Sequence, residues 1–269
     1  MTSRRLLISH ITSYRFDRPV TYALQRLKLR PKDSVGQNVI DWTIDIDGGN
    51  IESHAEDEHL NHVTLASITP GRSEIAITCS GTVVTENGDG VIGRHRGHIP
   101  LWCFLRPTKL TIAGKNIAKL LAGFKIDPAD QLAGLHALSA LVRTHLPYAD
   151  GYTAADTNAE QALSIGHGVC QDHAHIFIAA ARQLDIPARY VSGYLLIDGV
   201  VEQSASHAWA EVHIEPLGWV GFDISNGYSP DQRYVRVATG FDYRDAAPIS
   251  GLSFGAHDES MVVSLRVEQ

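Results

Sequence analysis

Long apolar runs are absent from this sequence of 269 residues, in which no segment approaches the roughly 20 apolar residues that cross a bilayer. The first ten residues contain only three consecutive apolar ones, Leu6 to Ile8, so we expect no secretory signal. Basic residues are also few, 23 against 30 acidic ones, for a net charge of −7. This balance disfavours nucleic acid or an anionic membrane as the main partner.

Cysteine is scarce as well, with three residues, Cys79, Cys103 and Cys170. An odd number of cysteines without an export signal argues against a disulfide framework and favours reduced thiols. We therefore expect a cytoplasmic protein. The question that remains is whether one of the three thiols is reactive.

The sequence otherwise has the composition of an ordinary globular chain, 44% hydrophobic and 20% charged, which excludes global disorder. At roughly 150 residues per domain, its length suggests about two domains. Up to about residue 105, short runs of β-branched and aromatic residues alternate with turn residues, as is typical of strands. We predict an N-terminal β-sandwich-like module over residues 1–108, with a hairpin-type turn at Asp47 to Asn50. Its strands are expected at Leu6 to Phe16, Leu24 to Leu29, Val39 to Ile46, Ile51 to Glu56, His62 to Ile68 and Ser73 to Thr85.

Residues 109–269 show a different pattern, in which apolar residues first recur at helical spacing and later in strand-like runs. Helices are predicted at Ile112 to Phe124, Gln131 to Leu146 and Cys170 to Leu184. The third is apolar nearly all round, which indicates a helix in the middle of a domain. Strands are predicted at Ala188 to Ile197, His207 to Ile214, Trp219 to Asp223 and Ser260 to Val267. Helices followed by strands favour an α+β domain with an antiparallel sheet.

The stretch from Gly166 to His173 carries a cysteine, Cys170, at the start of the predicted buried helix. A thiol at a helix N-terminus lies beside unpaired N–H groups and the positive end of the helix dipole, which favour the thiolate. A nucleophilic cysteine also needs a general base and a group that orients the base. His207 begins one downstream strand and Asp223 ends the next, and antiparallel pairing through the turn at Pro216 to Gly218 would make them neighbours.

These residues resemble the bacterial transglutaminase-like proteins of the cysteine peptidase type. The resemblance is carried by Gly168-Val169-Cys170-Gln171-Asp172, by Ile186 to Tyr194 with Arg182, by His207 to Val212, and by Gly218-Trp219 followed by Asp223. His10 to Val20, Arg26-Leu27 and Arg30-Pro31 resemble the β-rich N-terminal region of many bacterial members, and Gly240 to Asp245 with Pro248 resemble the tail. Asp185 departs from the pattern, because the family usually ends this helix with glycine.

The resemblance implies an α+β fold with a papain-like or transglutaminase-like core, in which helices pack on an antiparallel sheet. It places the family's catalytic cysteine, histidine and aspartate on Cys170, His207 and Asp223. It also implies acyl transfer from a peptide or carboxamide carbonyl, through a thioester on Cys170, to water or an amine. The residues leave open the second oxyanion donor, for which Gln161, Tyr152 and Gln171 are candidates beside the Cys170 N–H.

A metal or cofactor site is disfavoured by spacing. His173 and His175 would diverge by about 200° on a helix, so they would not hold one ion between them. Asp172 and His175 could instead pair at helical spacing. Asp242 and Asp245, with Arg244 between them, could bind calcium as some animal relatives do, but a solvated turn is favoured. Trp209, on the strand face of His207, fits either a wall of the site or a core position equally well.

Two hypotheses follow from the sequence. The first is a thiol-dependent enzyme acting on a peptide or protein substrate, with hydrolysis favoured over protein crosslinking and with no cofactor. The second is a non-catalytic binding or scaffold module that retains the fold. The sequence does not determine the natural substrate, the role of the N-terminal module or the oligomeric state.

Overall fold

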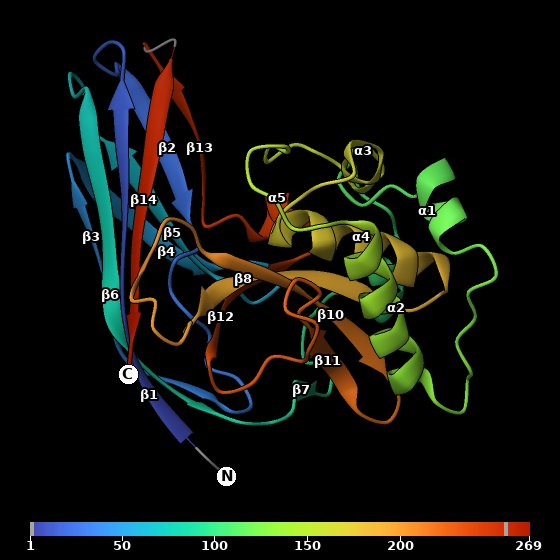
Figure 1. The fold of residues 1–269 in the computed structure, drawn as a ribbon. Coiled ribbons are helices and arrows are strands. Elements are labelled where there is room, and N and C mark those ends of the chain that lie inside the picture. The colour runs from blue at the N-terminus through green and yellow to red at the C-terminus, as the bar shows by residue number, and fades with distance from the viewer. Residues whose placement is uncertain (1–2, 256–257) are drawn as a thin grey trace.

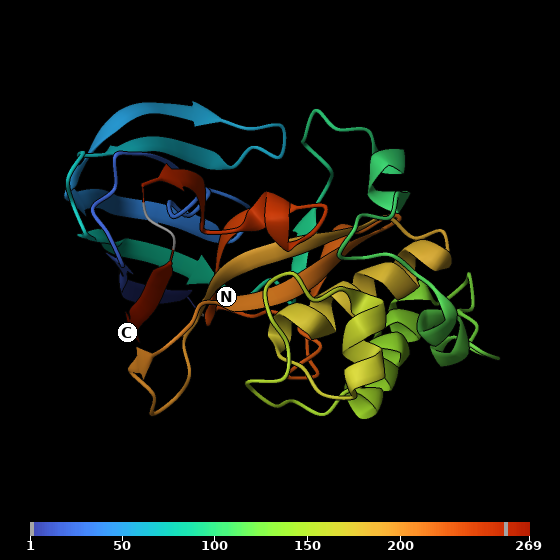
Figure 2. The same ribbon diagram turned by 90° about the horizontal axis from the view of Figure 1, so that it is seen from above.

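The computed structural model describes residues 3–255 and 258–269. Two β-sheets stand together on one side of the molecule, and a third sheet, with helices against one face, forms the other side (Figure 1). The view from above shows the same division, with the helices gathered away from the first two sheets (Figure 2). The fold is therefore an α+β fold with an N-terminal sheet module, as the sequence predicts.

The N-terminal module consists of a five-stranded sheet in the order β3-β6-β1-β14-β9 and a four-stranded sheet in the order β13-β2-β5-β4. Strand β1 shows why these segments form sheets, because its even-numbered residues from Leu6 to Phe16 are buried while most of the others face solvent. The strands are β1 (Ser3–Phe16), β2 (Tyr22–Leu27), β3 (Gln37–Asp47), β4 (Gly49–Glu56), β5 (His62–Ile68), β6 (Glu74–Glu86), β9 (Glu202–Gln203), β13 (Ile249–Phe254) and β14 (Glu259–Glu268).

The second part of the molecule is built on a five-stranded antiparallel sheet in the order β12-β8-β10-β11-β7. Its strands are β7 (Val91–Gly93), β8 (Ala188–Leu195), β10 (His207–Ile214), β11 (Gly218–Phe222) and β12 (Tyr234–Gly240). The helices are the 3-10 helix η1 (Leu101–Leu105) and the α-helices α1 (Lys115–Leu120), α2 (Gln131–His145), α3 (Ala159–Ile165), α4 (Cys170–Gln183) and α5 (Tyr243–Ala246).

Helix α4 lies at the centre of this part, as its nearly continuous apolar surface predicts. Every residue from Asp172 to Arg182 is buried. One face of strand β10, carrying Ala208, Ala210 and Val212, belongs to the same hydrophobic core as α4. The alternate residues Trp209 and Glu211 therefore point to the other face of the sheet. Asp185, where the family usually has glycine, adopts the left-handed conformation that favours glycine, with φ of +57°.

Two predicted connections are wrong. The turn at Asp47 to Asn50 does not form a hairpin, because β3 pairs with β6 while β4 pairs with β5 in the other sheet. The strand predicted at Ser260 to Val267 does not join the sheet of the second part. It forms β14 and pairs antiparallel with β1, from Leu7 opposite Glu268 to Phe16 opposite Glu259. Alternation identifies a half-buried strand but says nothing of its partner.

Other helices and strands are shorter than the sequence predicts or were not predicted at all. The helix predicted at Ile112 to Phe124 is helical only over α1, because it starts after Gly114 and Gly123 has a positive φ of +78°. Strand β12 is buried at every position, so it shows no alternation. The short elements α3, α5, β7, β9 and β13 were not predicted either. None of the helices in the described ranges has the length and hydropathy to span a membrane.

Candidate active site

The hairpin of β10 and β11 places His207 and Asp223 at one end of the sheet. The two strands pair antiparallel, with Ala210 opposite Phe222. His207 begins β10, and Asp223 follows directly after the last residue of β11. His207 and Asp223 are neighbours, as the sequence predicts, since His207 Nε2 lies 2.6 Å from Asp223 Oδ2.

The Asp223 carboxylate is fully buried and is held by two further side chains. The Tyr234 hydroxyl donates to Oδ2 at 2.6 Å, and the Asn226 side-chain amide donates to the same oxygen at 2.7 Å. The Asn226 backbone N–H also donates to Oδ1 at 3.2 Å. Hydrogen bonds of this kind stabilise the ionised carboxylate, and with His207 they lower the pKa of Asp223 although burial alone would raise it. Asp223 therefore has two roles, since it fixes the turn that follows it and also orients His207.

Cys170 is the first residue of α4, as predicted. The loop before it is fixed by Asp172, whose Oδ2 accepts from the Val169 N–H at 2.8 Å and from the Thr153 hydroxyl at 2.7 Å. Gly168 is required here, because a Cβ at this position would lie 2.8 Å from the Asp172 side chain. The first N–H groups of a helix have no acceptor within the helix, so this end of α4 offers donors beside the thiol.

The His207 imidazole interacts with both Asp223 and Cys170. Burial alone would lower the pKa of His207, but hydrogen bonds to Asp223 and Cys170 and the charges of both raise it to about 10. Because Nε2 is bound to Asp223, the ring presents Nδ1 to the thiol. The structure thus brings together Cys170, His207 and Asp223, the three residues singled out from the sequence.

A cavity of about 280 Å³ opens at Cys170 and His207. One side of it comes from the second part of the molecule, including Tyr190 of β8 and Ala208 of β10. The N-terminal module supplies the opposite wall with the β1 residues His10 and Thr12 and the β14 residues Met261 and Val263, together with Ile249 of β13. The two parts of the chain therefore enclose the candidate site between them.

The cavity is chemically neutral apart from the site itself, because none of the described residues that line it is Asp, Glu, Lys or Arg. His10 is uncharged near neutral pH, since burial lowers its pKa to about 4. Its ring nitrogens lie 3.0 Å from the Tyr194 hydroxyl and 3.0 Å from the Thr12 hydroxyl. An uncharged pocket with a few hydroxyl groups favours a polar but neutral group of a ligand.

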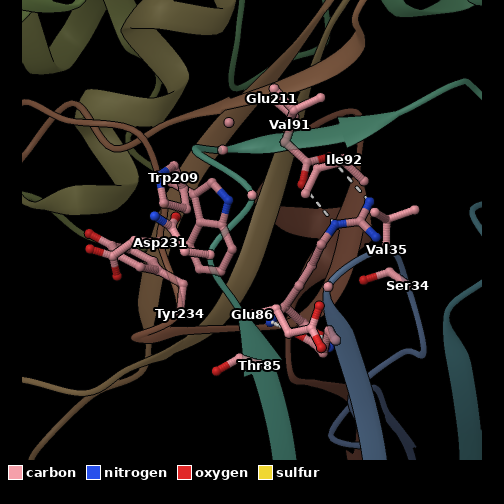
Figure 3. A pocket seen from close by; sticks show the side chains of 18 residues that line it. Ser34, Val35, Thr85, Glu86, Val91, Ile92, Trp209, Glu211, Asp231 and Tyr234 are labelled. Atoms are coloured by element: carbon pink, nitrogen blue, oxygen red, sulfur yellow. Dashed lines mark hydrogen bonds and ion pairs between the residues drawn. The ribbon is translucent and has the colours of Figure 1, made fainter. Parts of the chain in front are cut away.

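Trp209 is a core residue and does not line the cavity at Cys170. It is 2% exposed and lies behind His207, with ring centroids 6.3 Å apart, and it packs edge-on against Tyr234 at 5.4 Å. Figure 3 shows Trp209 and Tyr234 together on one side of a second cavity, with Ser34 and Val35 on the other side. Trp209 thus supports His207 and Tyr234 from the side away from α4.

The three candidates for a second oxyanion donor differ in position. Gln161 is used elsewhere, because its side chain accepts from the Asn158 N–H in the capping box of α3. Tyr152 is 58% exposed and stacks on His167. Gln171 lines the cavity beside Cys170 and donates to the Ala155 carbonyl at 3.1 Å. Of the three, Gln171 alone contributes to the cavity.

The residues weighed for a metal site have other partners. Asp172 and His175 do not pair, because Asp172 binds Val169 and Thr153, while His175 Nε2 accepts from the Tyr243 N–H at 3.1 Å. Within the described residues, no group of three His, Cys, Asp or Glu side chains is arranged to hold a metal ion. The expected solvated turn at Asp242 and Asp245 is wrong, since Asp242 is 4% exposed and caps α5 while Asp245 accepts from the Phe241 N–H.

The sequence did not identify two groups that support the site. Tyr234 lies in the unpredicted strand β12, and nothing in its sequence context marks it as a partner of Asp223. His173 donates from Nε2 to the Leu146 carbonyl at 2.7 Å, and its Nδ1 lies 2.7 Å from the Ser225 hydroxyl. Since Ser225 is two residues from Asp223, His173 connects helix α4 to the turn that carries the carboxylate.

The start of helix α3, by contrast, has a signal in the sequence, because Asn158 followed by Gln161 is the pattern of a capping box.

Comparisons with known proteins give the same family as the sequence motifs. The Transglutaminase-like superfamily matches residues 119–224, and the Bacterial transglutaminase-like N-terminal region matches residues 6–84. An uncharacterized protein of Mycobacterium leprae is 27% identical over 288 aligned positions, covering 97% of this chain and 98% of the relative. An uncharacterized protein of Mycobacterium tuberculosis strain H37Rv is 27% identical over 291 positions, covering 99% and 92%.

A solved structure shows the same fold. The crystal structure of a candidate cysteine protease from Cytophaga hutchinsonii superimposes with a TM-score of 0.76 at 20% sequence identity, covering 100% of this chain and 99% of that one. The chain thus contains a transglutaminase-like core over residues 119–224 and the bacterial transglutaminase-like N-terminal region over residues 6–84. The match to this family and the site at Cys170 together support an enzyme that depends on a thiol.

Proposed function

We propose that this protein transfers the acyl group of a peptide or carboxamide substrate through a thioester on Cys170, with water as the favoured acceptor. The observation that carries the proposal is that Cys170 and His207 line one cavity while the buried Asp223 binds the imidazole. Each role has a group to fill it, because the imidazole is bound to the Asp223 carboxylate and shares the cavity with the Cys170 thiol.

The reaction begins when the Cys170 sulfur attacks the carbonyl carbon of the substrate. As the tetrahedral intermediate collapses, the carbon–nitrogen bond breaks and His207 Nδ1–H protonates the leaving amine or ammonia. A water molecule then attacks the thioester and gives its proton to His207. The carbon–sulfur bond breaks, the acid is released, and the free Cys170 sulfur and the protonated His207 are restored. Asp223 keeps the ring oriented and compensates its positive charge throughout.

The neutral cavity supports an uncharged group next to the reacting carbonyl. A carboxamide side chain or an apolar residue would fit this lining, whereas a carboxylate or ammonium would lose its hydration without gaining an ion pair. The wall of Met261, Val263 and Ile249 would contact this part of the substrate. We infer that the N-terminal module takes part in substrate recognition.

Reactive-thiol labelling tests the proposal. We expect iodoacetamide at neutral pH to label Cys170 faster than the other two cysteines, and Cys170→Ala to remove this fast labelling. Cys103→Ala is the matched control and should leave the fast phase intact, because Cys103 is half-buried and lies in η1. Cys79 is fully buried, and burial raises the pKa of its thiol to about 12. Fast labelling that persists in Cys170→Ala would overturn the assignment of the nucleophile.

A peptide library containing glutamine separates the two outcomes of the acyl-enzyme. Release of ammonia or of a cleaved peptide without amine incorporation is expected for hydrolysis, while incorporation of a labelled primary amine indicates transamidation. Labelling of Cys170 without turnover of any library member would favour the alternative, a module that keeps the fold and binds ligands without catalysis.

A further inference from the structure

A third cavity, of about 310 Å³, lies where the N-terminal module meets the face of the sheet opposite α4. It is lined by Lys32 to Val35 from the loop after β2, by the segment around Arg94 and Arg96 after β7, and by sheet residues. The connection between β4 and β5 adds Glu56, His59, Leu60 and His62. The sheet contributes Arg189 of β8 and Arg236 of β12. Cavities between two structural units are frequent sites of small ligands.

This cavity concentrates positive charge in a protein whose net charge is −7. Five cationic side chains line it, Lys32, Arg94, Arg96, Arg189 and Arg236, against two carboxylates, Asp33 and Glu56. Arg94, Arg96, Asp33 and Glu56 are exposed, whereas Lys32, Arg189 and Arg236 are at most 9% exposed. The exposed charges balance one another, so the buried basic side chains determine the sign of the net charge that lines the cavity.

One carboxylate serves two of the buried cations. Arg189 Nε lies 2.6 Å from Glu211 Oε2, and Arg236 Nε lies 2.7 Å from Glu211 Oε1. Figure 3 shows Glu211 near Ile92 and Val35, two residues that line both this cavity and its neighbour. Two arginines on one glutamate leave one positive charge without a compensating negative charge.

Lys32 is a third buried basic side chain. Its Nζ donates to the His59 carbonyl at 2.8 Å and to the Thr239 hydroxyl at 2.9 Å, and among the described residues no carboxylate lies within 4 Å of it. The nearby Asp57 is already bound to Lys28 at 2.6 Å. Burial and the charges of Arg236 and Arg189 hold the pKa of Lys32 well below its usual value, as expected where positive charge is in excess.

We propose that this cavity binds a small polyanion carrying phosphate or carboxylate groups, separate from the candidate active site. Arginine side chains bind such groups through paired, charge-assisted hydrogen bonds, and a bound anion would compensate the buried excess of positive charge. The volume suits a compact ligand of a few hydrogen-bonding groups rather than a polymer. The site does not depend on the proposed acyl transfer.

Inorganic pyrophosphate titrated into the full chain, at constant ionic strength, tests this proposal by calorimetry. We expect saturable binding of one pyrophosphate per chain, weakened about tenfold or more in the double variant Arg94→Ala/Arg96→Ala, since a charge-assisted hydrogen bond contributes about 1.5–3 kcal/mol. Both arginines are exposed, so the variant should fold, which its melting temperature verifies.

The matched control is Arg15→Ala/Arg266→Ala, which removes the same charge from two exposed arginines outside the cavity. Its affinity for pyrophosphate should equal that of the wild type. The proposal is overturned if the wild type shows no saturable binding, or if the control weakens binding as much as the cavity variant does. Cys170 labelling is measured separately, so either of these two results would leave the proposed function untouched.

Discussion

At the scale of single residues, the charge of His207 is decided by a competition between burial and its two partners. Burial favours the neutral ring, whereas Asp223 and Cys170 favour the imidazolium and raise the pKa of His207 to about 10. A protonated imidazole beside the sulfur favours the thiolate, which is the nucleophilic form of cysteine. The Asp223 carboxylate is therefore expected to determine whether the site is ready to react.

Replacing Asp223 with Asn should reverse the shift of the His207 pKa. The wild-type ring is expected to titrate near pH 10, and the ring of Asp223→Asn at a clearly lower pH, because burial remains while the contribution of the carboxylate is lost. NMR of the imidazole protons measures the pKa of His207 in the wild type and in the variant. Tyr234→Phe is the control, since it removes one hydrogen bond to Asp223 but keeps the charge. Equal titration of wild type and Asp223→Asn would contradict this account.

The raised pKa of His207 also predicts how the stability of the protein depends on pH. Because the folded pKa of His207 lies above 6.5, its interaction with Asp223 contributes fully below pH 6.5 and is lost as the pH rises through about 10. The advantage of the wild type over Asp223→Asn in the free energy of unfolding should therefore shrink between these values. Urea unfolding at several pH values measures it, and a constant difference across this range would refute the prediction.

The sequence was sufficient to predict that Cys170, His207 and Asp223 come together, because helix start, strand start and strand end are positions that local signals reveal. It could not identify Tyr234 or His173 as supports of the site. Their contacts with Asp223 and Ser225 join segments that are distant in the chain, and the residue types alone do not specify such partners.

At the scale of elements, strand β14 presents alternate residues to different surroundings. Met261 and Val263 line the cavity at Cys170, whereas Val262 between them is 67% exposed and does not. A charge at position 263 would therefore lie inside the neutral cavity, and the same charge at position 262 would lie in solvent.

Val263→Asp should discriminate against an anionic reagent at Cys170. We expect the ratio of alkylation rates with iodoacetamide and iodoacetate to rise roughly fivefold, since a fixed negative charge in the cavity should repel the anion by about 1 kcal/mol. Val262→Asp carries the same charge on the neighbouring residue and should leave the ratio close to that of the wild type. Equal ratios in the two variants would show that β14 does not bound the reacting site.

Elements with a clear period were predictable and those without one were not. Strand β1 alternates over its length and α4 begins at a glycine-rich turn, so both were identified with nearly correct limits. Strand β12 is buried on both faces and β13 has no buried residue in its pattern, so neither produces alternation. The pairing of β14 with β1 joins residues more than 240 positions apart, and periodicity carries no information on such partners.

At the scale of the whole molecule, the two predicted regions are interleaved. Strands β13 and β14 return to the N-terminal sheets after the chain has formed the second part. Tyr194, Leu196, Val235 and Val237 also belong to the hydrophobic core of the N-terminal module. The predicted division of the chain after residue 108 stays a prediction. Its two sides share a core, which favours unfolding as one unit.

Calorimetry tests this cooperativity. We expect a single thermal transition with a ratio of calorimetric to van't Hoff enthalpy close to one, because the shared core and the crossing strands couple the two parts. Val235→Ala, which removes buried volume from the shared core, should lower the midpoint of that transition as a whole. Two resolved transitions, of which only one moves in the variant, would refute the coupling.

The place of β14 in the chain also has a consequence for biosynthesis. A ribosome releases Cys170, His207 and Asp223 before Met261 and Val263, so a nascent chain can pair the imidazole with its carboxylate while the far wall of the cavity is still missing. Substrate recognition through that wall begins only once β14 has docked beside β1. Chemical competence and selectivity would thus arise at different moments of synthesis.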